Sequence, residues 1–124
     1  EEYIYKSTVY EARIENSIVG ILVLFRNSDI EIEIKNVAVD PFFQGRGIGK
    51  ELILLGISES KKIQYQKISI CTGNSSTHQL VLYQSCGFNI TDTIRDFFIH
   101  HYEEEIWENG IQCKDLIKLE LNLS

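Results

Sequence analysis

Apolar and polar residues alternate along much of the first third of the chain, which is the pattern of half-buried β-strands. Residues 8–15 and 18–26 fit this pattern, and the polar pair at 16–17 predicts a two-residue hairpin turn between them. A second turn at residues 27–29 leads into a third strand at 30–39. We therefore expect the chain to begin with a meander of three antiparallel strands.

The third strand contains a break in its alternation. Its apolar side chains are Ile30, Ile32, Ile34, Val37 and Val39. The first three alternate with charged residues, whereas the last two fall on the charged face. A one-residue β-bulge near Lys35 and Asn36 would return all five to one side, and would also open the strand end to an extended, amide-bearing ligand. A strand end that is buried on both faces is the alternative.

Helical and strand patterns alternate in the second half of the chain. Residues 48–63 predict a helix whose apolar face consists of Ile48, Leu52, Ile53, Ile57 and Ile63. Residues 67–71 return as a strand, and the strand, helix, strand order makes it parallel to the strand at 30–39. The fold is therefore expected to contain one parallel strand pair.

A short second helix carries signals at both of its ends. Ser76 and Gln79 have the spacing of a capping box, in which Ser76 is the N-cap. Gly87 can end the helix in a left-handed conformation, with Phe88 folding back onto it. The remaining elements are expected to be a strand at 89–98, a loop with an Asn-Gly turn at 103–112 and a final strand at 113–121.

A glycine-rich turn, residues 44–50, lies between the third strand and the first helix and reads Gln-Gly-Arg-Gly-Ile-Gly-Lys. Glycines let the backbone approach a ligand closely, and the unpaired N–H groups of a first helical turn favour an anion. The spacing does not fit a P-loop, because Lys50 is followed by Glu51 and not by Ser or Thr. It does not fit a dinucleotide fingerprint either, because Lys50 occupies the position of its third glycine. It fits the pattern Q-x-x-G-x-G instead.

Composition and charge describe a small acidic domain. A chain of 124 residues makes one domain with a single core. The net charge of −6 argues against nucleic acid as the main partner and suits a cationic one better. No apolar run approaches the length of a membrane span or resembles a signal peptide, so we expect a cytoplasmic protein without a membrane partner.

The cysteines and the absence of methionine add two further expectations. Cys71, Cys86 and Cys113 are odd in number and widely spaced, which predicts buried reduced thiols and neither a disulfide framework nor a metal site. Methionine is absent from the chain, so we expect further residues to precede Glu1 in the natural protein.

Three motifs then carry a resemblance to a known family. The first joins residues 37–39 to the Q-x-x-G-x-G turn, and the second is Asn74 after the parallel strand. The third is Leu-Tyr-Gln-Ser-Cys-Gly-Phe at 82–88, which is similar to a Y-x-x-x-G-F ending. In this order they resemble the GNAT superfamily of acyl-CoA-dependent N-acetyltransferases.

The resemblance implies a fold for the whole chain, residues 1–124, as a single domain. That fold is α/β (α+β), with a mixed, mostly antiparallel twisted sheet, helices on both faces and one central pair of parallel strands. The first strand and first two helices of the family have no counterpart here, and we expect residues 1–6 to be what remains of the second helix. The cofactor site should therefore be readable, and the acceptor site only in part.

The resemblance also implies acetyl-CoA as the co-substrate. Main-chain groups of the third strand would bind its pantetheine, and the amides of the glycine-rich turn would bind its pyrophosphate. The cofactor-binding residues expected on this basis are Val37, Ala38, Val39, Gln44, Gly45, Arg46, Gly47, Ile48, Gly49, Lys50 and Asn74.

The reaction of such a site is attack of a neutral amine on a thioester. Because an alkyl ammonium has a pKa of about 10.4, the amine needs a base. The resemblance favours Glu33 as this base, with Glu31 as the substitute. The base would act from a buried position, which raises its pKa, or through a water. For both residues the alternative is a solvated strand carboxylate. The resemblance also favours Tyr83 as the acid that protonates the departing thiolate, and the alternative is that Tyr83 is an aromatic core residue. The Val39 amide would donate a hydrogen bond to the carbonyl.

The function expected from these residues is transfer of an acetyl group from acetyl-CoA to a primary amine, a small molecule, directly within a ternary complex. Cys71 and Cys86 lack an evident base partner, so nothing calls for a covalent acyl-enzyme. The acidic and aromatic residues at 103–108 would border the acceptor by family analogy, although a solvated loop is the simpler interpretation. A protein N-terminal or lysine acetyltransferase and an idle acyl-CoA-binding module stay open, as does a homodimer.

Overall fold

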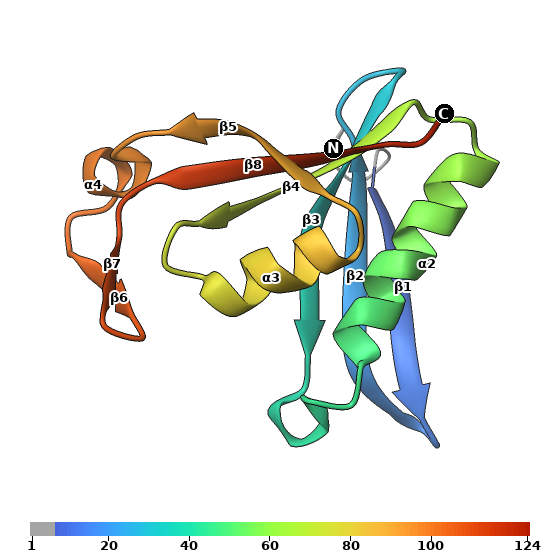
Figure 1. The fold of residues 1–124 in the computed structure, drawn as a ribbon. Coiled ribbons are helices and arrows are strands. Elements are labelled where there is room, and N and C mark those ends of the chain that lie inside the picture. The colour runs from blue at the N-terminus through green and yellow to red at the C-terminus, as the bar shows by residue number, and fades with distance from the viewer. Residues whose placement is uncertain (1–6) are drawn as a thin grey trace. The chain divides into compact units, whose positions relative to one another are not determined.

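The computed structural model describes residues 7–124, so the expectation for residues 1–6 lies outside the described part (Figure 1). Its elements are β1 (Ser7–Ile14), β2 (Ser17–Arg26), β3 (Glu31–Val39), η1 (Pro41–Phe43), α2 (Ile48–Lys62), β4 (Lys67–Gly73), α3 (Thr77–Ser85), β5 (Asn89–Ile94), α4 (Phe97–His101), β6 (Ile106–Glu108), β7 (Ile111–Cys113) and β8 (Leu116–Asn122). Six strands form a sheet in the order β1-β2-β3-β4-β8-β5, and β6 pairs with β7.

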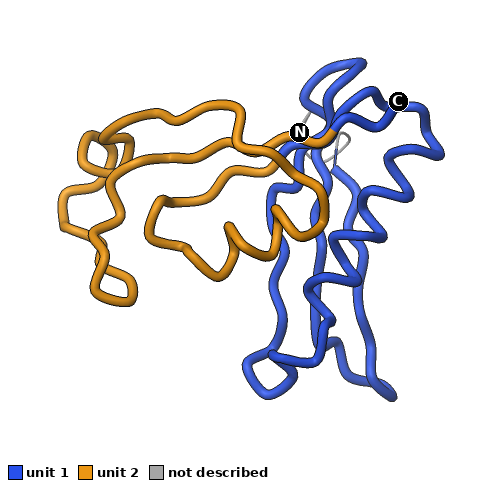
Figure 2. The backbone as a smooth tube through the Cα atoms, viewed as in Figure 1, with its two compact units in different colours: residues 1–69, 122–124 blue, residues 70–121 orange. Residues whose placement is uncertain are grey.

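The sheet is mixed, as expected. The pairs β1–β2, β2–β3 and β5–β8 are antiparallel, whereas β3 and β4, which α2 connects, are parallel. The chain divides into two compact units, residues 1–69 with 122–124 and residues 70–121 (Figure 2). No helix among residues 7–124 is long and apolar enough to cross a membrane.

The core of the first unit lies between α2 and the strands of its meander. A Cβ atom on Gly56 of α2 would come within 3.1 Å of Leu22 on β2, so the helix and the strand are in close contact. The buried apolar residues of this unit are Val19, Leu22, Leu24, Ile32, Ile34, Leu52, Ile53, Ile57 and Ile68. Burying such side chains stabilises a fold by about 1.5 to 3 kcal/mol each.

The predicted apolar face of α2 is largely correct. Leu52, Ile53 and Ile57 are buried, and Ile48 is half-buried in the first turn. The prediction is wrong for Ile63, because the helix ends at Lys62 and the Ile63 side chain is 48% exposed.

The predicted bulge in β3 is present. Asn36 pairs with Val23 of β2 and Ile34 pairs with Leu24, so that Lys35 between them has no partner on β2. One extra residue on one strand is the definition of a bulge.

The bulge restores the register of the apolar side chains. Ile34 and Val37 pair with Leu24 and Leu22, two β2 residues that face α2. By alternation, the side chains that share this face are Ile32, Ile34, Val37 and Val39. Ile30 does not belong to the set, because it precedes the strand and its side chain is 46% exposed.

The first hairpin turn lies one residue earlier than predicted. The strands end at Ile14 and begin again at Ser17, which leaves Glu15 and Asn16 in the turn. Glu15 has a φ of 56°, in the left-handed region that residues other than glycine seldom adopt. Ser17 is a more typical turn residue than Glu15, but it pairs with Ile14 as the first residue of β2. That pairing leaves Glu15 and Asn16 to form the turn.

In the second unit, α3 ends as the sequence predicts. Gly87 has a φ of +104°, and the N–H of Phe88 donates to the carbonyl of Tyr83 at 3.1 Å. The Phe88 side chain is 1% exposed and lies against the Tyr83 ring. This is the glycine-ended helix with an apolar residue folded back on it.

Two other predictions for this unit are wrong in part. The strand expected to continue to residue 98 ends at Ile94, and the short helix α4 follows an Asp96 whose φ is 57°. The segment expected to be a loop contains the hairpin of β6 and β7, although its Asn109–Gly110 turn is correct, with φ values of 52° and 79°. Two positive φ values are typical of a tight hairpin turn.

Candidate active site

The glycine-rich loop leaves the end of β3 in a fixed path. Asp40 caps the single turn η1, because its Oδ1 accepts a hydrogen bond from the Phe42 N–H at 2.9 Å. The Gln44 Nε2 amide then donates to the carbonyl of Val39 at 3.2 Å. The predicted cofactor residue Gln44 thus ties the loop to the last residue of the strand.

Two positions of the loop favour glycine because of their backbone conformation. Gly45 and Gly47 have φ values of +79° and +82°, and a Cβ atom on either would meet nothing within 4 Å. Gly47 is also the N-cap of α2. The space over these residues is open, so a ligand can approach the backbone.

The backbone N–H groups of this loop are available to a ligand. Within residues 7–124, the N–H groups of residues 45–50 have no hydrogen-bond acceptor, and Glu51 is the first whose N–H bonds within the turn, to the Gly47 carbonyl at 3.0 Å. These groups lie at the amino end of a 15-residue helix, where the helix dipole favours an anion. The geometry is that of a cradle for phosphate.

Positive side chains flank the cradle. The Arg46 guanidinium lies 4.9 Å from the centre of the Phe43 ring, a cation–π contact that restrains it. Arg46 and Lys50 are exposed, while Glu51 places one carboxylate in the first turn of α2. Because both side chains are exposed, either can turn toward a phosphate at the loop without breaking a buried contact.

Glu33 lies on β3, on the strand face opposite α2. Its carboxylate accepts a hydrogen bond from Asn27 Nδ2 at 2.9 Å and forms an ion pair with Lys35 Nζ at 3.4 Å. Its side chain is 16% exposed. The predicted base is therefore neither a freely solvated nor a buried carboxylate, but one that is held in place.

Glu31 is anchored in a different way. Its Oε2 accepts hydrogen bonds from Ser69 Oγ at 2.9 Å and from Asn27 Nδ2 at 3.2 Å, and Lys67 Nζ lies 3.7 Å from its Oε1. Asn27 thus donates to both candidate carboxylates. Because Glu31 joins β3 to β4 through Ser69, a structural role explains it well.

Tyr83 belongs to the second unit, on α3. Its side chain is 6% exposed and contacts the Phe88 ring, with ring centres 6.5 Å apart, and burial raises the pKa of its phenol above 10. Its hydroxyl has no hydrogen-bond partner within residues 7–124 and is not enclosed, unlike Ser60 Oγ. Tyr83 therefore combines a packed ring with a hydroxyl that bonds to no described residue.

Asn74 is engaged by its own unit. Its Oδ1 accepts hydrogen bonds from the N–H groups of Lys114 and Asp115 at 2.7 and 2.9 Å, and its Nδ2 donates to the Gln112 carbonyl at 3.2 Å. One Nδ2 hydrogen is left for a cofactor. The expectation that Asn74 binds the cofactor stays a prediction and is limited to that hydrogen.

The structure places the predicted residues on two parts of the chain. Glu33, residues 37–39 and the glycine-rich loop share β3 and the segment after it, whereas Asn74 and Tyr83 lie in the second unit. The proposed opening between β3 and β4 stays a prediction.

One set of contacts was not predicted. Ser75 and Ser76 both donate to Glu108, which no local pattern connects to them. The capping box at Ser76 is wrong for the same reason, because Ser76 is the N-cap of α3 but its hydroxyl makes no capping bond.

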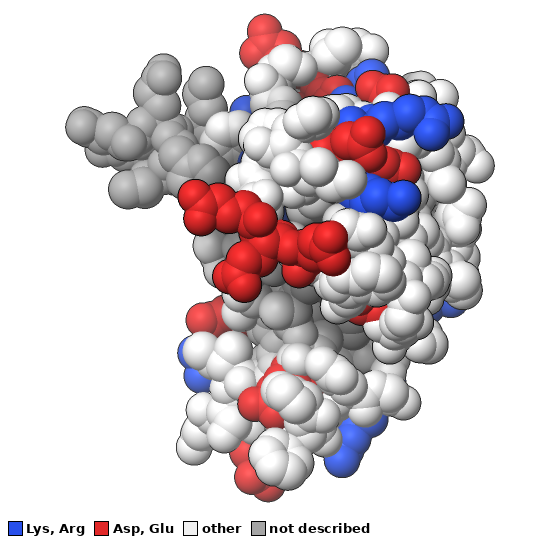
Figure 3. Space-filling view, turned by 90° about the vertical axis from the view of Figure 1, so that its left-hand side faces the viewer, with Lys and Arg blue, Asp and Glu red and all other residues white. Residues whose placement is uncertain are grey.

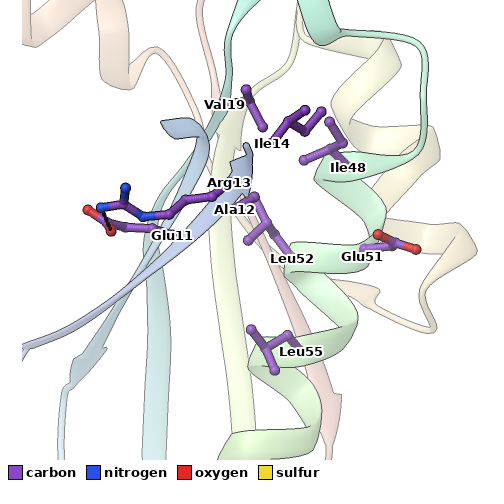
Figure 4. A pocket seen from close by; sticks show the side chains of 9 residues that line it. All are labelled: Glu11, Ala12, Arg13, Ile14, Val19, Ile48, Glu51, Leu52 and Leu55. Carbon is purple, nitrogen blue, oxygen red and sulfur yellow. Dashed lines mark hydrogen bonds and ion pairs between the residues drawn. The ribbon is translucent and has the colours of Figure 1, made fainter. Parts of the chain in front are cut away.

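The first unit also contains a pocket of about 390 Å³ between β1 and the first turns of α2 (Figure 4). Its lining consists of Glu11, Ala12, Arg13, Ile14, Val19, Ile48, Glu51, Leu52 and Leu55. Glu11 and Arg13 pair with each other at 3.0 Å on the side of β1 away from the helix, so the interior of the pocket is mainly apolar. Of the predicted site residues only Ile48 lines it.

Comparison with known proteins identifies the family. The model of the acetyltransferase (GNAT) family matches residues 2–88, which include the glycine-rich loop, Asn74 and Tyr83. The chain belongs to the GNAT family. This match confirms the resemblance that the three sequence motifs indicated.

Individual GNAT relatives extend the likeness to the whole chain. The protein named "Uncharacterized N-acetyltransferase YvbK" from Bacillus subtilis (strain 168) is 45% identical over 123 residues, which are 99% of this chain and 79% of that protein. A GNAT acetyltransferase from Elizabethkingia anophelis, solved with acetyl-CoA bound, is 46% identical with a TM-score of 0.91, covering 98% of this chain and 80% of the other. A Bacillus subtilis acetyltransferase solved in complex with CoA is 45% identical with a TM-score of 0.94, covering 99% and 81%.

These relatives establish the GNAT fold and the enzyme class of the chain. The mixed six-stranded sheet is that of the two solved relatives, and acetyltransferase is the activity of the family. Acetyl-CoA or CoA is bound in both of them, which supports acetyl-CoA as the co-substrate. Among residues 7–124 no group of three or more His, Cys, Asp or Glu side chains could hold a metal ion.

Proposed function

We propose that this GNAT protein transfers the acetyl group of acetyl-CoA to the primary amine of a small molecule, directly within a ternary complex. The observation that carries the proposal is the loop of residues 45–50, where unpaired N–H groups, two left-handed glycines and a helix amino end face open space. The pyrophosphate of the co-substrate would lie on this loop, next to Arg46 and Lys50.

The end of β3 would hold the rest of the co-substrate. Extended main chain at Val37, Ala38 and Val39 offers amide and carbonyl groups to the pantetheine, while the bulge at Lys35 sets the direction of the strand end. The Val39 N–H would donate to the thioester carbonyl, where negative charge develops during attack.

The proposed chemistry follows from two side chains. The amine loses a proton to Glu33 through a water, because the Lys35 and Asn27 contacts hold the carboxylate in place. The amine nitrogen then bonds to the carbonyl carbon, the C–S bond breaks, and the thiolate takes the phenol proton of Tyr83. The nitrogen of the new amide gives up its second proton to water, and the Tyr83 phenolate regains a proton from water. No step leaves an acyl group on the protein.

A cationic amine suits the charge of the chain. Its net charge is −6, and residues 103–108 carry four glutamates around Trp107. Acidic and aromatic groups together attract ammonium groups. We include this segment in the proposed acceptor side.

Calorimetric titration with acetyl-CoA, beside NAD and ATP, tests the co-substrate. A thiol-release assay on a panel of tyramine, spermidine, a lysine peptide and an alanine-initiated peptide then tests the acceptor. We expect saturable binding of acetyl-CoA alone and thiol release with a small amine. Turnover with peptides only would replace the small-molecule acceptor with a protein, and binding without any turnover would indicate an idle acyl-CoA module.

A further inference from the structure

The turn after β4 is bonded to the β6–β7 hairpin by two serines. Ser75 Oγ and Ser76 Oγ each donate to Glu108 Oε1 at 3.0 Å, and Ser75 is completely buried. A single carboxylate oxygen thus accepts two hydroxyl groups from the start of α3. Hydrogen bonds to a charged acceptor contribute more than bonds between neutral groups.

The residue before these serines fixes the other side of the hairpin. Asn74 bonds through its side chain to the Gln112 carbonyl and to the N–H groups of Lys114 and Asp115. Its own N–H donates to the Asp115 carbonyl at 3.0 Å. Four hydrogen bonds from one residue therefore define the path of the chain from β7 into β8.

Close packing supports the same junction. A Cβ atom on Gly73, the residue before Asn74, would lie 2.5 Å from Cys113 Sγ, so the two chain segments touch without space for a side chain. Cys113 is itself buried. The hairpin is therefore held by contacts at both of its strands.

The hairpin presents its outer face to solvent. Trp107 precedes Glu108 on β6, and because side chains alternate along a strand, the indole points away from the serines. It is 59% exposed and donates from Nε1 to Glu105 Oε1 at 3.0 Å. Figure 3, which views the side of α4 and the hairpin, shows acidic side chains gathered on this face, and the exposed acids of the segment are Glu103, Glu104 and Glu105.

We propose that Asn74, Ser75, Ser76 and Glu108, together the hairpin clamp, are positioning residues that determine the affinity for the amine acceptor by holding the β6–β7 hairpin. The clamp contributes little to the binding of acetyl-CoA. This inference rests on the proposed function, because it takes the hairpin as part of the acceptor side. It assigns Asn74 a role different from the cofactor contact that the resemblance implies.

The test uses the double variant Ser75→Ala, Ser76→Ala, with Ser85→Ala as the matched control. Ser85 is exposed on α3, and among the described residues its hydroxyl bonds to the Leu82 carbonyl of the same helix and to no other group. Loss of the clamp should raise the KM for the best amine of the panel about 10-fold, the equivalent of one bond to a charged group, with kcat within about twofold. The dissociation constant for acetyl-CoA should stay within about twofold of the wild type.

Two further variants separate positioning from folding. Glu108→Gln keeps an Oε1 acceptor for both hydroxyls, so its KM should stay near that of the wild type, whereas Glu108→Ala should match the double variant. Asn74→Ala should raise the acceptor KM and leave acetyl-CoA binding unchanged. A loss of acetyl-CoA affinity with an unchanged acceptor KM would overturn the proposal and assign Asn74 to the cofactor.

The hairpin contains its own probe, because Trp107 is the only tryptophan of the chain. Quenching of its fluorescence by acrylamide should increase at least about 1.5-fold in the double variant and stay unchanged in Ser85→Ala. This measurement and the acetyl-CoA titration need no turnover. A wild type that acetylates no amine would therefore refute the proposed function, while unchanged quenching in the double variant would refute the clamp.

Discussion

A pair of matched substitutions, Gly47→Ala and Gly110→Ala, tests whether the glycine-rich loop binds the co-substrate. The two glycines have φ values of +82° and +79°, and a Cβ atom on either would meet nothing within 4 Å. They differ in their place: Gly47 caps α2 beside the unpaired N–H groups, whereas Gly110 lies in the turn between β6 and β7.

The strain of the two substitutions should be equal. An L-residue in the left-handed region costs about 1 to 2 kcal/mol, and no clash adds to this value at either position. Urea denaturation should therefore show that both variants lose about 1 to 2 kcal/mol of folding free energy. This equality makes Gly110→Ala a control for general destabilisation.

Binding of acetyl-CoA should separate the two variants. The methyl group that Gly47→Ala adds would occupy open space over the loop, where the pyrophosphate must approach its amides. If it displaces one hydrogen bond to a charged oxygen, about 1.5 to 3 kcal/mol is lost, which is about 10- to 150-fold in the dissociation constant.

Calorimetric titration of the wild type and both variants measures this difference, at a temperature where all three are folded. We expect Gly110→Ala to bind acetyl-CoA within about twofold of the wild type. An equal loss of affinity in the two variants would assign the effect to destabilisation, and an unchanged affinity in Gly47→Ala would remove the loop from the binding site.

Three further predictions concern the acid, the base and the packing of the second unit. Because burial raises the pKa of Tyr83, the folded chain keeps the phenol proton to higher pH than the unfolded chain, so the folding free energy should fall as pH rises above about 10. Urea titrations of Tyr83→Phe should show a shallower fall. The same variant should slow acetyl transfer without abolishing it. Glu33→Gln should lower kcat about 100-fold at neutral pH with the acetyl-CoA affinity unchanged, and a kcat within twofold would exclude Glu33 as the base. Gly73→Ala should cost about 1 to 3 kcal/mol by overpacking against Cys113 Sγ, and a thermodynamic cycle with Cys113→Ala should show coupling, whereas additive losses would contradict the contact.

The local patterns of the sequence predicted those parts of the fold that depend on local physics. The bulge at Lys35 follows from a conflict of parity that only an extra residue can resolve, and the end of α3 follows from Gly87 and Phe88. The glycine-rich loop was recognisable from its glycines, two of which, Gly45 and Gly47, have positive φ values. Each of these features lies within a few residues of its signal.

The features that were missed depend on distant partners. Ser76 has the spacing of a capping box, but its hydroxyl bonds to Glu108, 32 residues further along the chain. The turn into α4 is held by Asp115, whose Oδ1 accepts from the Asp96 N–H at 2.9 Å, and by the bond from the Phe98 N–H to the Lys114 carbonyl. Such contacts override the strand propensity of an aromatic segment, and no local pattern shows them.

Asn74 shows the limit of motif transfer. The resemblance implies a cofactor contact for this amide, yet all three hydrogen bonds of its side chain lie within its own unit. Only the contacts reveal that the residue also shapes the hairpin. Sequence could indicate that the position matters, and the structure was needed to show for what.

The bulge in β3 has an evolutionary consequence. Deleting the single codon for Lys35 would remove the one residue of β3 that has no partner on β2, and the two strands would then pair regularly. Because Ile34 and Asn36 would become neighbours, Val37 and Val39 would keep their places opposite α2, and no second length change would be needed to restore the core face. Related chains should therefore differ in the length of this strand by one residue at the bulge, whereas a deletion within its regularly paired part would move apolar side chains to the wrong face.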